Sequence, residues 1–79
     1  MFVFKQFYMT GGSDVVFENI RNLREDHDLT QEQVASILNV KQTTYSKYEL
    51  GKINIPIEVF ITLADYYNVS IDYLVGRKP

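Results

Sequence analysis

Residues 29–51 read LTQEQVASILNVKQTTYSKYELG, and this stretch decides the fold of the chain. Thr30 and Gln33 are spaced as a capping box, in which each side chain accepts a hydrogen bond from the backbone N–H of the other residue. Asn39 tolerates the left-handed conformation that ends many helices. The stretch therefore predicts a helix over residues 31–38.

A second helix follows almost at once. Gly51 suits the position just past a helix end, so residues 42–50 are predicted to be helical, with Tyr45 and Tyr48 on the inward face. Only residues 39–41 separate the two helices. Two short helices with such a tight connection present the second one as a ridge that fits the major groove of DNA, which is about 12 Å wide.

The outward face of this second helix carries side chains suited to base edges. Glutamine can hold adenine through two hydrogen bonds, threonine offers a hydroxyl and a methyl group for thymine, and lysine can bind guanine or phosphate. We therefore interpret four residues as base-reading: Gln42, Thr43, Thr44 and Lys47.

The flanking sequence predicts three more helices. An apolar stripe at helical spacing precedes the pair and should end before Leu29. Pro56 suits the first turn of a fourth helix, which Asn68 ends. Ser70 can cap a short last helix that stops at Gly76. We expect an all-α fold, a compact bundle of five helices.

The first residues differ in character from the rest. Residues 1–9 are MFVFKQFYM, rich in aromatic side chains and without a helical stripe, and a Gly-Gly-Ser joint at residues 11–13 follows them. We expect residues 1–13 to be an extended N-terminal segment attached to one domain at residues 14–79. Three alternatives stay open for the segment: a strand that pairs with another molecule, a disordered tail or a cloning remnant.

The composition excludes several classes of protein. A chain of 79 residues forms one small core, which leaves little room for an enzyme with a deep substrate cleft. The absence of cysteine and the presence of one histidine exclude disulfides, Cys-ligated zinc and multi-histidine metal sites. We therefore expect no enzyme activity, no cofactor, no small-molecule substrate and no membrane span. The absence of cysteine also leads us to expect that the protein works in a reducing cytoplasm.

The formal net charge of −2 argues at first against a nucleic-acid partner, since duplex binding depends on Lys and Arg. The charge is uneven, however. Residues 14–32 hold six carboxylates and two arginines, whereas residues 41–52 hold three lysines and one glutamate. Positive charge is thus concentrated on the predicted groove-reading helix and its linker. The acidic total predicts weak non-specific binding and dependence on good base contacts.

The ordered set of motifs resembles the Cro and lambda-repressor type of helix-turn-helix protein, often called the XRE family. The resemblance covers residues 15–78 and implies a lambda-repressor-like fold that binds double-stranded DNA in a bacterium or its phage. The matching strings are IRNLR at 20–24, LTQEQVA at 29–35, YELGK at 48–52, Pro56, and NVSIDYL at 68–74.

The resemblance also implies roles for single residues. It places Gln31 against the phosphate backbone at the start of the second helix, and Lys41 and Lys52 near phosphates. Arg24 and Glu49 match a pair that bridges the first and third helices, and we expect its role to be structural.

The chain departs from the family pattern at two functional positions. Lys41 stands where a Ser or Thr cap is common, so the third helix is expected to lack a side-chain cap. Tyr45 replaces the usual aliphatic residue; we expect its hydroxyl to bond backbone within the core, with a surface partner as the alternative.

Aromatic residues exceed what a small core needs, which suggests an interface. A module of this size touches few base pairs, so we expect a homodimer that reads half-sites about 34 Å apart. The candidate dimer contacts are Phe2, Phe4, Phe7, Tyr8, Tyr66 and Tyr73.

We therefore interpret the chain as a sequence-specific DNA-binding transcriptional regulator, a repressor of a pseudo-palindromic operator. The alternative is a module with the same fold that binds another protein, such as a toxin or a partner regulator. The acidic total and the aromatic N-terminus favour that alternative.

Overall fold

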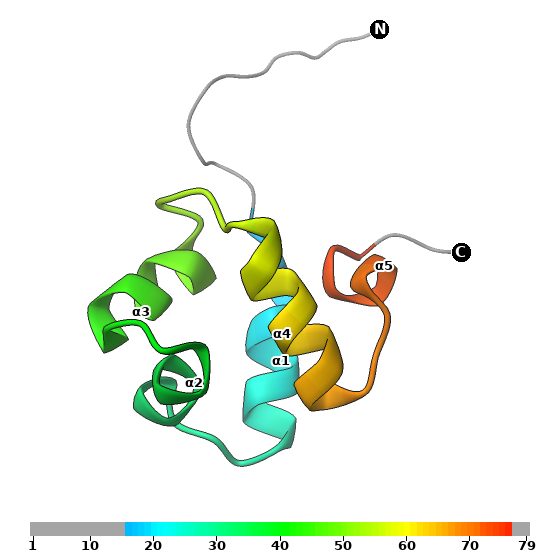
Figure 1. Ribbon diagram of the computed structural model, residues 1–79, viewed down its shortest axis with the longest axis horizontal. Helices are drawn as coiled ribbons and strands as arrows, with labels where there is room; N and C mark the ends of the chain where they lie inside the picture. The colour runs from blue at the N-terminus through cyan, green and yellow to red at the C-terminus, as the bar shows by residue number, and fades with distance from the viewer. Residues whose placement is uncertain (1–15, 77–79) are drawn as a thin grey trace, which may run out of the picture.

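The computed structural model describes residues 16–76, and within them every regular element is a helix (Figure 1). The predicted all-α bundle of five helices is confirmed for this part of the chain. The predicted N-terminal segment, residues 1–13, lies outside the described residues. The helices are α1 (Glu18–Asp26), α2 (Gln31–Leu38), α3 (Gln42–Leu50), α4 (Ile57–Tyr67) and α5 (Ile71–Leu74).

Local side-chain chemistry sets the limits of α2. The Thr30 hydroxyl accepts from the Gln33 backbone N–H at 3.0 Å, and the Gln33 side chain accepts from the Thr30 backbone N–H at 2.8 Å. The predicted capping box is therefore present in both directions. Asn39 ends the helix in the left-handed region at φ 60°, as predicted.

The other helix ends follow the same logic, with one difference. Gly51 and Asn68 end α3 and α4 at φ 71° and 57°, and the Ser70 hydroxyl accepts from the Tyr73 backbone N–H to cap α5. Pro56, predicted inside the first turn of α4, precedes that turn because its ψ of 150° is extended. The Pro56 carbonyl still accepts a hydrogen bond from the Val59 backbone N–H, so Pro56 is the N-cap residue of α4 and not its first helical residue.

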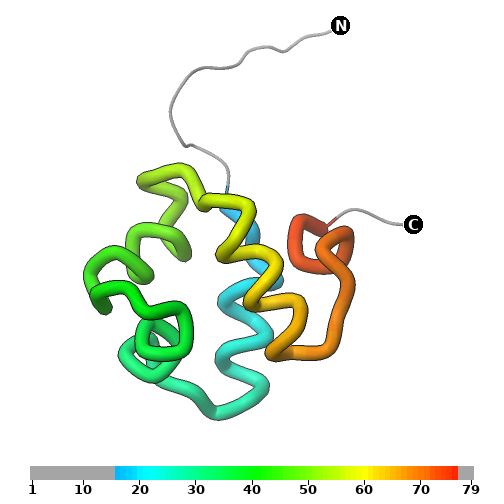
Figure 2. The backbone as a smooth tube through the Cα atoms, in the orientation of Figure 1, coloured from blue at the N-terminus to red at the C-terminus, as the bar shows by residue number. Residues whose placement is uncertain are grey.

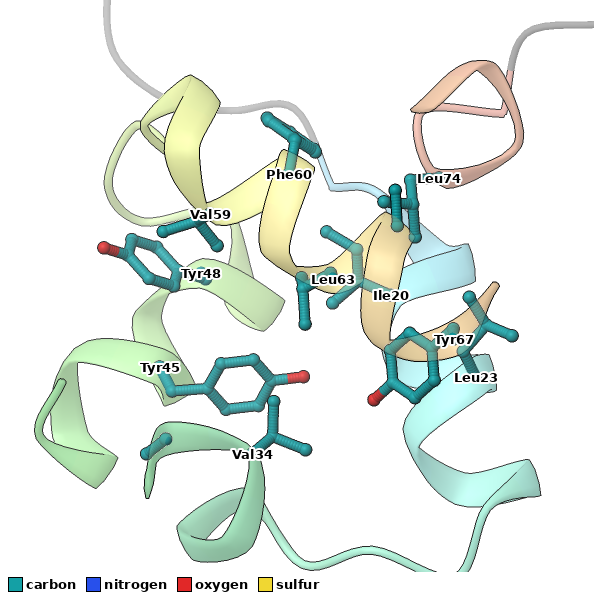
Figure 3. Packing of buried hydrophobic residues seen from close by; sticks show 12 residues of the cluster. Ile20, Leu23, Val34, Tyr45, Tyr48, Val59, Phe60, Leu63, Tyr67 and Leu74 are labelled. Atoms are coloured by element: carbon teal, nitrogen blue, oxygen red, sulfur yellow. The ribbon is translucent and has the colours of Figure 1, made fainter. Parts of the chain in front are cut away.

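The helices surround one apolar core. In the ribbon and the tube, α2 and α3 lie on one side of α1 and α4, while α5 lies on the other side (Figures 1 and 2). Ile20 of α1 and Leu63 of α4 meet at the centre, and Leu74 closes the α5 side (Figure 3). The ring of Tyr45 points from α3 into this core. The position of α3 is thus fixed from its buried face, which leaves the opposite face to solvent.

None of the helices within residues 16–76 has the length and apolar character needed to cross a membrane.

Candidate nucleic-acid interface

The predicted base-reading residues share the outward face of α3. Gln42, Thr43 and Lys47 are exposed, and Thr44 is half-buried. The opposite face holds the buried residues Tyr45, Tyr48 and Glu49. An outward face of amide, hydroxyl and ammonium groups can donate to and accept from base edges.

Both ends of α3 carry an exposed lysine. Lys41 is the residue before the first helical position and makes no capping hydrogen bond through its side chain, as predicted. Lys52 follows the left-handed Gly51, and its backbone N–H donates to the Lys47 carbonyl at 2.9 Å. The two lysines therefore lie just outside the two ends of α3.

A buried carboxylate fixes α3 to the rest of the bundle. The side chain of Glu49 is 3% exposed, and that of its partner Arg24 in α1 is 14% exposed. Arg24 donates from Nε to Oε2 of Glu49 at 2.7 Å and from Nη2 to Oε1 at 3.2 Å. Nη1 of Arg24 also donates to the Leu29 carbonyl at 2.9 Å. One guanidinium therefore ties together α1, α3 and the turn that leads into α2.

The same carboxylate reaches the first residue of α2. Gln31 Nε2 donates to Oε1 of Glu49 at 3.0 Å, and Gln31 Oε1 accepts from Gln42 Nε2 at 2.9 Å. Gln31 is half-buried, whereas Gln42 is exposed. A continuous chain of hydrogen bonds thus runs from the buried Glu49 to the outward face of α3.

The hydroxyl of Tyr45 has a partner that the sequence did not suggest. Tyr45 is fully buried and donates to Oε2 of Glu49 at 2.5 Å, one helical turn further along α3. The expectation of a backbone partner is wrong, and so is the alternative of a surface partner. The reason is that an ionised carboxylate on the same helix face is a stronger acceptor than a carbonyl that is already bonded within the helix.

The surroundings of Glu49 determine its charge. Burial alone would raise the pKa of the Glu49 carboxyl, but hydrogen bonds from Arg24, Tyr45 and Gln31 hold that pKa below its ordinary value. Burial and the bond to Glu49 raise the pKa of Tyr45 well above its ordinary value. At neutral pH, Glu49 is therefore an ionised acceptor and Tyr45 a protonated donor.

The predicted dimer contacts are only partly within the described residues. Tyr66 and Tyr73 are exposed on α4 and α5. The ring of Tyr66 packs edge-on against Tyr67 with centroids 5.3 Å apart, and the Tyr73 carbonyl accepts from Asn19 Nδ2 at 2.6 Å. The remaining candidates lie outside the described residues: Phe2, Phe4, Phe7 and Tyr8.

A family model described as Helix-turn-helix matches residues 20–74. The chain belongs to this helix-turn-helix family. The match includes most of α1 and all of α2 to α5, and it confirms the resemblance to the Cro and lambda-repressor type that the motifs indicate.

Named relatives of this helix-turn-helix chain include a repressor, a control protein and an antitoxin. It is 43% identical over 57 residues to the transcriptional repressor RstR of the cryptic phage CTXphi of Vibrio cholerae, covering 72% of this chain and 51% of RstR. It is 31% identical over 65 residues to the control protein C.SmaI of Serratia marcescens, covering 82% of this chain and 77% of that protein. Several other curated relatives are matched over about half of their length.

A solved structure has the same arrangement of helices. The crystal structure of a transcriptional regulator from Listeria innocua matches with a TM-score of 0.73 at 40% sequence identity. The match covers 78% of this chain and 58% of that one. The helix-turn-helix fold is therefore shared over most of the chain.

Three contacts of this helix-turn-helix were not predicted from the sequence, and the first is the bond from Gln31 to Glu49. The bond between Gln31 and Gln42 joins the first residues of α2 and α3, and the bond from Tyr45 to Glu49 joins residues four apart on α3. The spacing of Tyr45 and Glu49 was a usable signal, since side chains four apart share a helix face. Nothing local indicated that the two glutamines would meet.

Proposed function

We propose that this helix-turn-helix protein is a sequence-specific transcriptional regulator, a repressor that binds double-stranded DNA as a homodimer on a pseudo-palindromic operator. The observation that carries the proposal is the chain of hydrogen bonds from buried Glu49 through Gln31 to exposed Gln42. A surface with no ligand does not need an exposed glutamine held at a set angle. A helix that reads bases does, because discrimination depends on donor and acceptor direction.

In this proposal α3 enters the major groove, and Gln42 reads one adenine. One N–H of the Gln42 amide donates to Gln31, which leaves its second N–H and its Oε1 for base contacts. The free N–H donates to adenine N7 and the oxygen accepts from N6, as a bidentate contact requires. Thr43, Thr44 and Lys47 contact neighbouring base edges from the same face.

The phosphate contacts set the position of α3 in the groove. Lys41 and Lys52 neutralise phosphates at the two ends of α3, and the second N–H of Gln31 donates to a phosphate oxygen. These contacts are independent of sequence, and they make binding weaken as salt is raised. The acidic α1 lies outside the contact surface in this arrangement.

Repression follows from occupancy of the operator. One module contacts few base pairs, so two copies on half-sites about 34 Å apart supply the affinity. The candidate dimer contacts Tyr66 and Tyr73 are exposed on α4 and α5, away from the polar face of α3. The likeness to RstR, a transcriptional repressor, and to C.SmaI, a control protein, supports this kind of regulation.

Selection of bound sequences from a random duplex pool tests the proposal with the full chain. We expect a palindromic sequence to be recovered. If no sequence is enriched and the binding of duplex DNA does not depend on salt, a protein-binding module is favoured instead. In the recovered operator, Gln42→Ala should reduce discrimination at one base position by about 1–3 kcal/mol. The matched control is Lys52→Ala, which should weaken all sequences alike and lower the salt slope by about one.

A further inference from the structure

We propose that Tyr45 is a positioning residue for base discrimination, acting on Gln42 through Glu49 and Gln31. The inference rests on the proposed function and extends it to a buried residue that cannot touch DNA. The path has three bonds: Tyr45 Oη to Glu49 Oε2 at 2.5 Å, Gln31 Nε2 to Glu49 Oε1 at 3.0 Å, and Gln42 Nε2 to Gln31 Oε1 at 2.9 Å.

The path has a fixed direction because its inner end can only accept. An ionised carboxylate has no proton to donate, so the group of Gln31 that faces Glu49 must be the amide nitrogen. The oxygen of Gln31 then faces Gln42, which must present its own nitrogen. The Gln42 amide is therefore held with its nitrogen on the side of Gln31 and its oxygen on the other side, so the positions of its free donor and its acceptor are fixed. On its major-groove edge adenine offers an acceptor at N7 and a donor at N6, whereas guanine offers two acceptors.

The arrangement holds only while the carboxylate of Glu49 keeps its orientation. The last torsion of a glutamate side chain is broad and has no strong preference of its own. Arg24 contacts both oxygens from α1, but its side chain is long and partly exposed. Tyr45 contacts Oε2 from the same helix as Glu49, and its ring is fully buried and therefore held in place.

Loss of the Tyr45 hydroxyl removes one of the two donors to Oε2. The carboxylate can then turn toward Arg24 alone, and the bond from Gln31 to Oε1 lengthens. Gln31 gains freedom, and the amide of Gln42 samples both orders of donor and acceptor. The charged phosphate contacts are unaffected, because none of the lysines lies on this path, and weakening of the neutral Gln31 contact to phosphate lowers affinity for every sequence alike.

The substitution Tyr45→Phe tests the inference because it keeps the ring and removes only the hydroxyl. In the full chain we expect discrimination at the base read by Gln42 to fall about 2- to 10-fold, the range that one hydrogen bond supplies. Discrimination at other positions and the salt slope should not change. The matched control is Tyr48→Phe, which removes a hydroxyl from the same buried face of α3 at a residue outside the path; it should leave all base preferences intact.

A second substitution separates positioning from a general structural effect. In a Gln42→Ala background, Tyr45→Phe should cause no further loss of discrimination, because the side chain that Tyr45 is proposed to position is then absent. A loss spread equally over all base positions, or full discrimination in Tyr45→Phe, overturns the inference. If the unsubstituted chain enriches no sequence from the random duplex pool, the proposed function itself fails, before any variant is compared.

Nuclear magnetic resonance of the free protein gives a readout that does not require DNA. The side-chain amide signals of Gln31 and Gln42 should shift in Tyr45→Phe and stay in place in Tyr48→Phe. If the amide signals do not shift in Tyr45→Phe, the Tyr45 hydroxyl does not position Gln31 and Gln42, and the inference is overturned whatever the protein binds.

Discussion

The third and fourth helices bury one face each but are held in place by different means. The buried residues of α4 are all aliphatic or aromatic, and the one buried hydroxyl, that of Tyr67, has no hydrogen-bond partner within the described residues. The buried face of α3 includes an ionised carboxylate, and the hydroxyl of Tyr45 is bonded to it. Apolar packing fixes where a helix lies, whereas hydrogen bonds also fix the direction of each group. The helix with the polar anchor is the one proposed to read bases.

Arg24→Met should produce the largest effect, because it leaves the carboxylate of Glu49 buried without its ion pair. We expect a loss of about 3–5 kcal/mol in the free energy of unfolding, measured by urea denaturation. Base preference should fall as well, since Glu49 holds Gln31. The control is Arg21→Met in the same helix, whose pair with Glu25 is exposed at 64% and 52%; it should cost less than about 0.5 kcal/mol. Equal losses in the two variants would contradict the comparison.

Leu63→Ala tests the apolar side of the same comparison. Leu63 is 1% exposed at the centre of the core, and its truncation should cost about 2–5 kcal/mol through lost burial and a cavity. In conditions where the variant stays folded, its base preference should match that of the unsubstituted chain. Ile61→Ala, on the exposed face of α4, should change stability by no more than about 0.5 kcal/mol. A changed base preference in Leu63→Ala would show that packing alone sets the direction of Gln42.

The same contrast explains what the sequence could predict. The limits of α2 depend on Thr30, Gln33 and Asn39, which are local neighbours, so the sequence located that helix and its ends correctly. The bonds from Gln31 to Glu49 and from Gln42 to Gln31 instead join residues 18 and 11 positions apart on different helices. Long-range contacts of this kind have no local pattern. The surface of α3 was therefore predictable, while the bonds that orient it were not.

Acid should destabilise the protein through Glu49. Its pKa in the folded chain lies below the ordinary value of 4.5, so the ionised form stabilises the fold. That contribution is fully present above pH 4.5 and is lost as the pH falls through the lowered value. The slope for one such proton approaches about 1.4 kcal/mol per pH unit. Urea denaturation between pH 7 and pH 3 should show a flatter dependence of the free energy of unfolding on pH for Glu49→Gln than for the unsubstituted chain.

Lys41→Ser should have the smallest effect on stability and the opposite sign. The N-terminus of α3 has no side-chain cap, whereas Thr30 and Ser70 cap α2 and α5. A serine at position 41 can accept from the free backbone N–H groups and should stabilise the fold by about 1 kcal/mol, measured as an increase in the free energy of unfolding.

The same Lys41→Ser substitution should weaken DNA binding. Removal of one phosphate contact lowers affinity for every sequence alike and reduces the salt slope by about one. A gain in stability without a change in salt slope would mean that Lys41 faces no phosphate, and the missing cap would then have no explanation in binding. A decrease in both the free energy of unfolding and the salt slope would mean that the lysine itself stabilises the start of α3. Opposite changes in stability and affinity would show that α3 gives up local stability at the end proposed to meet the backbone of DNA.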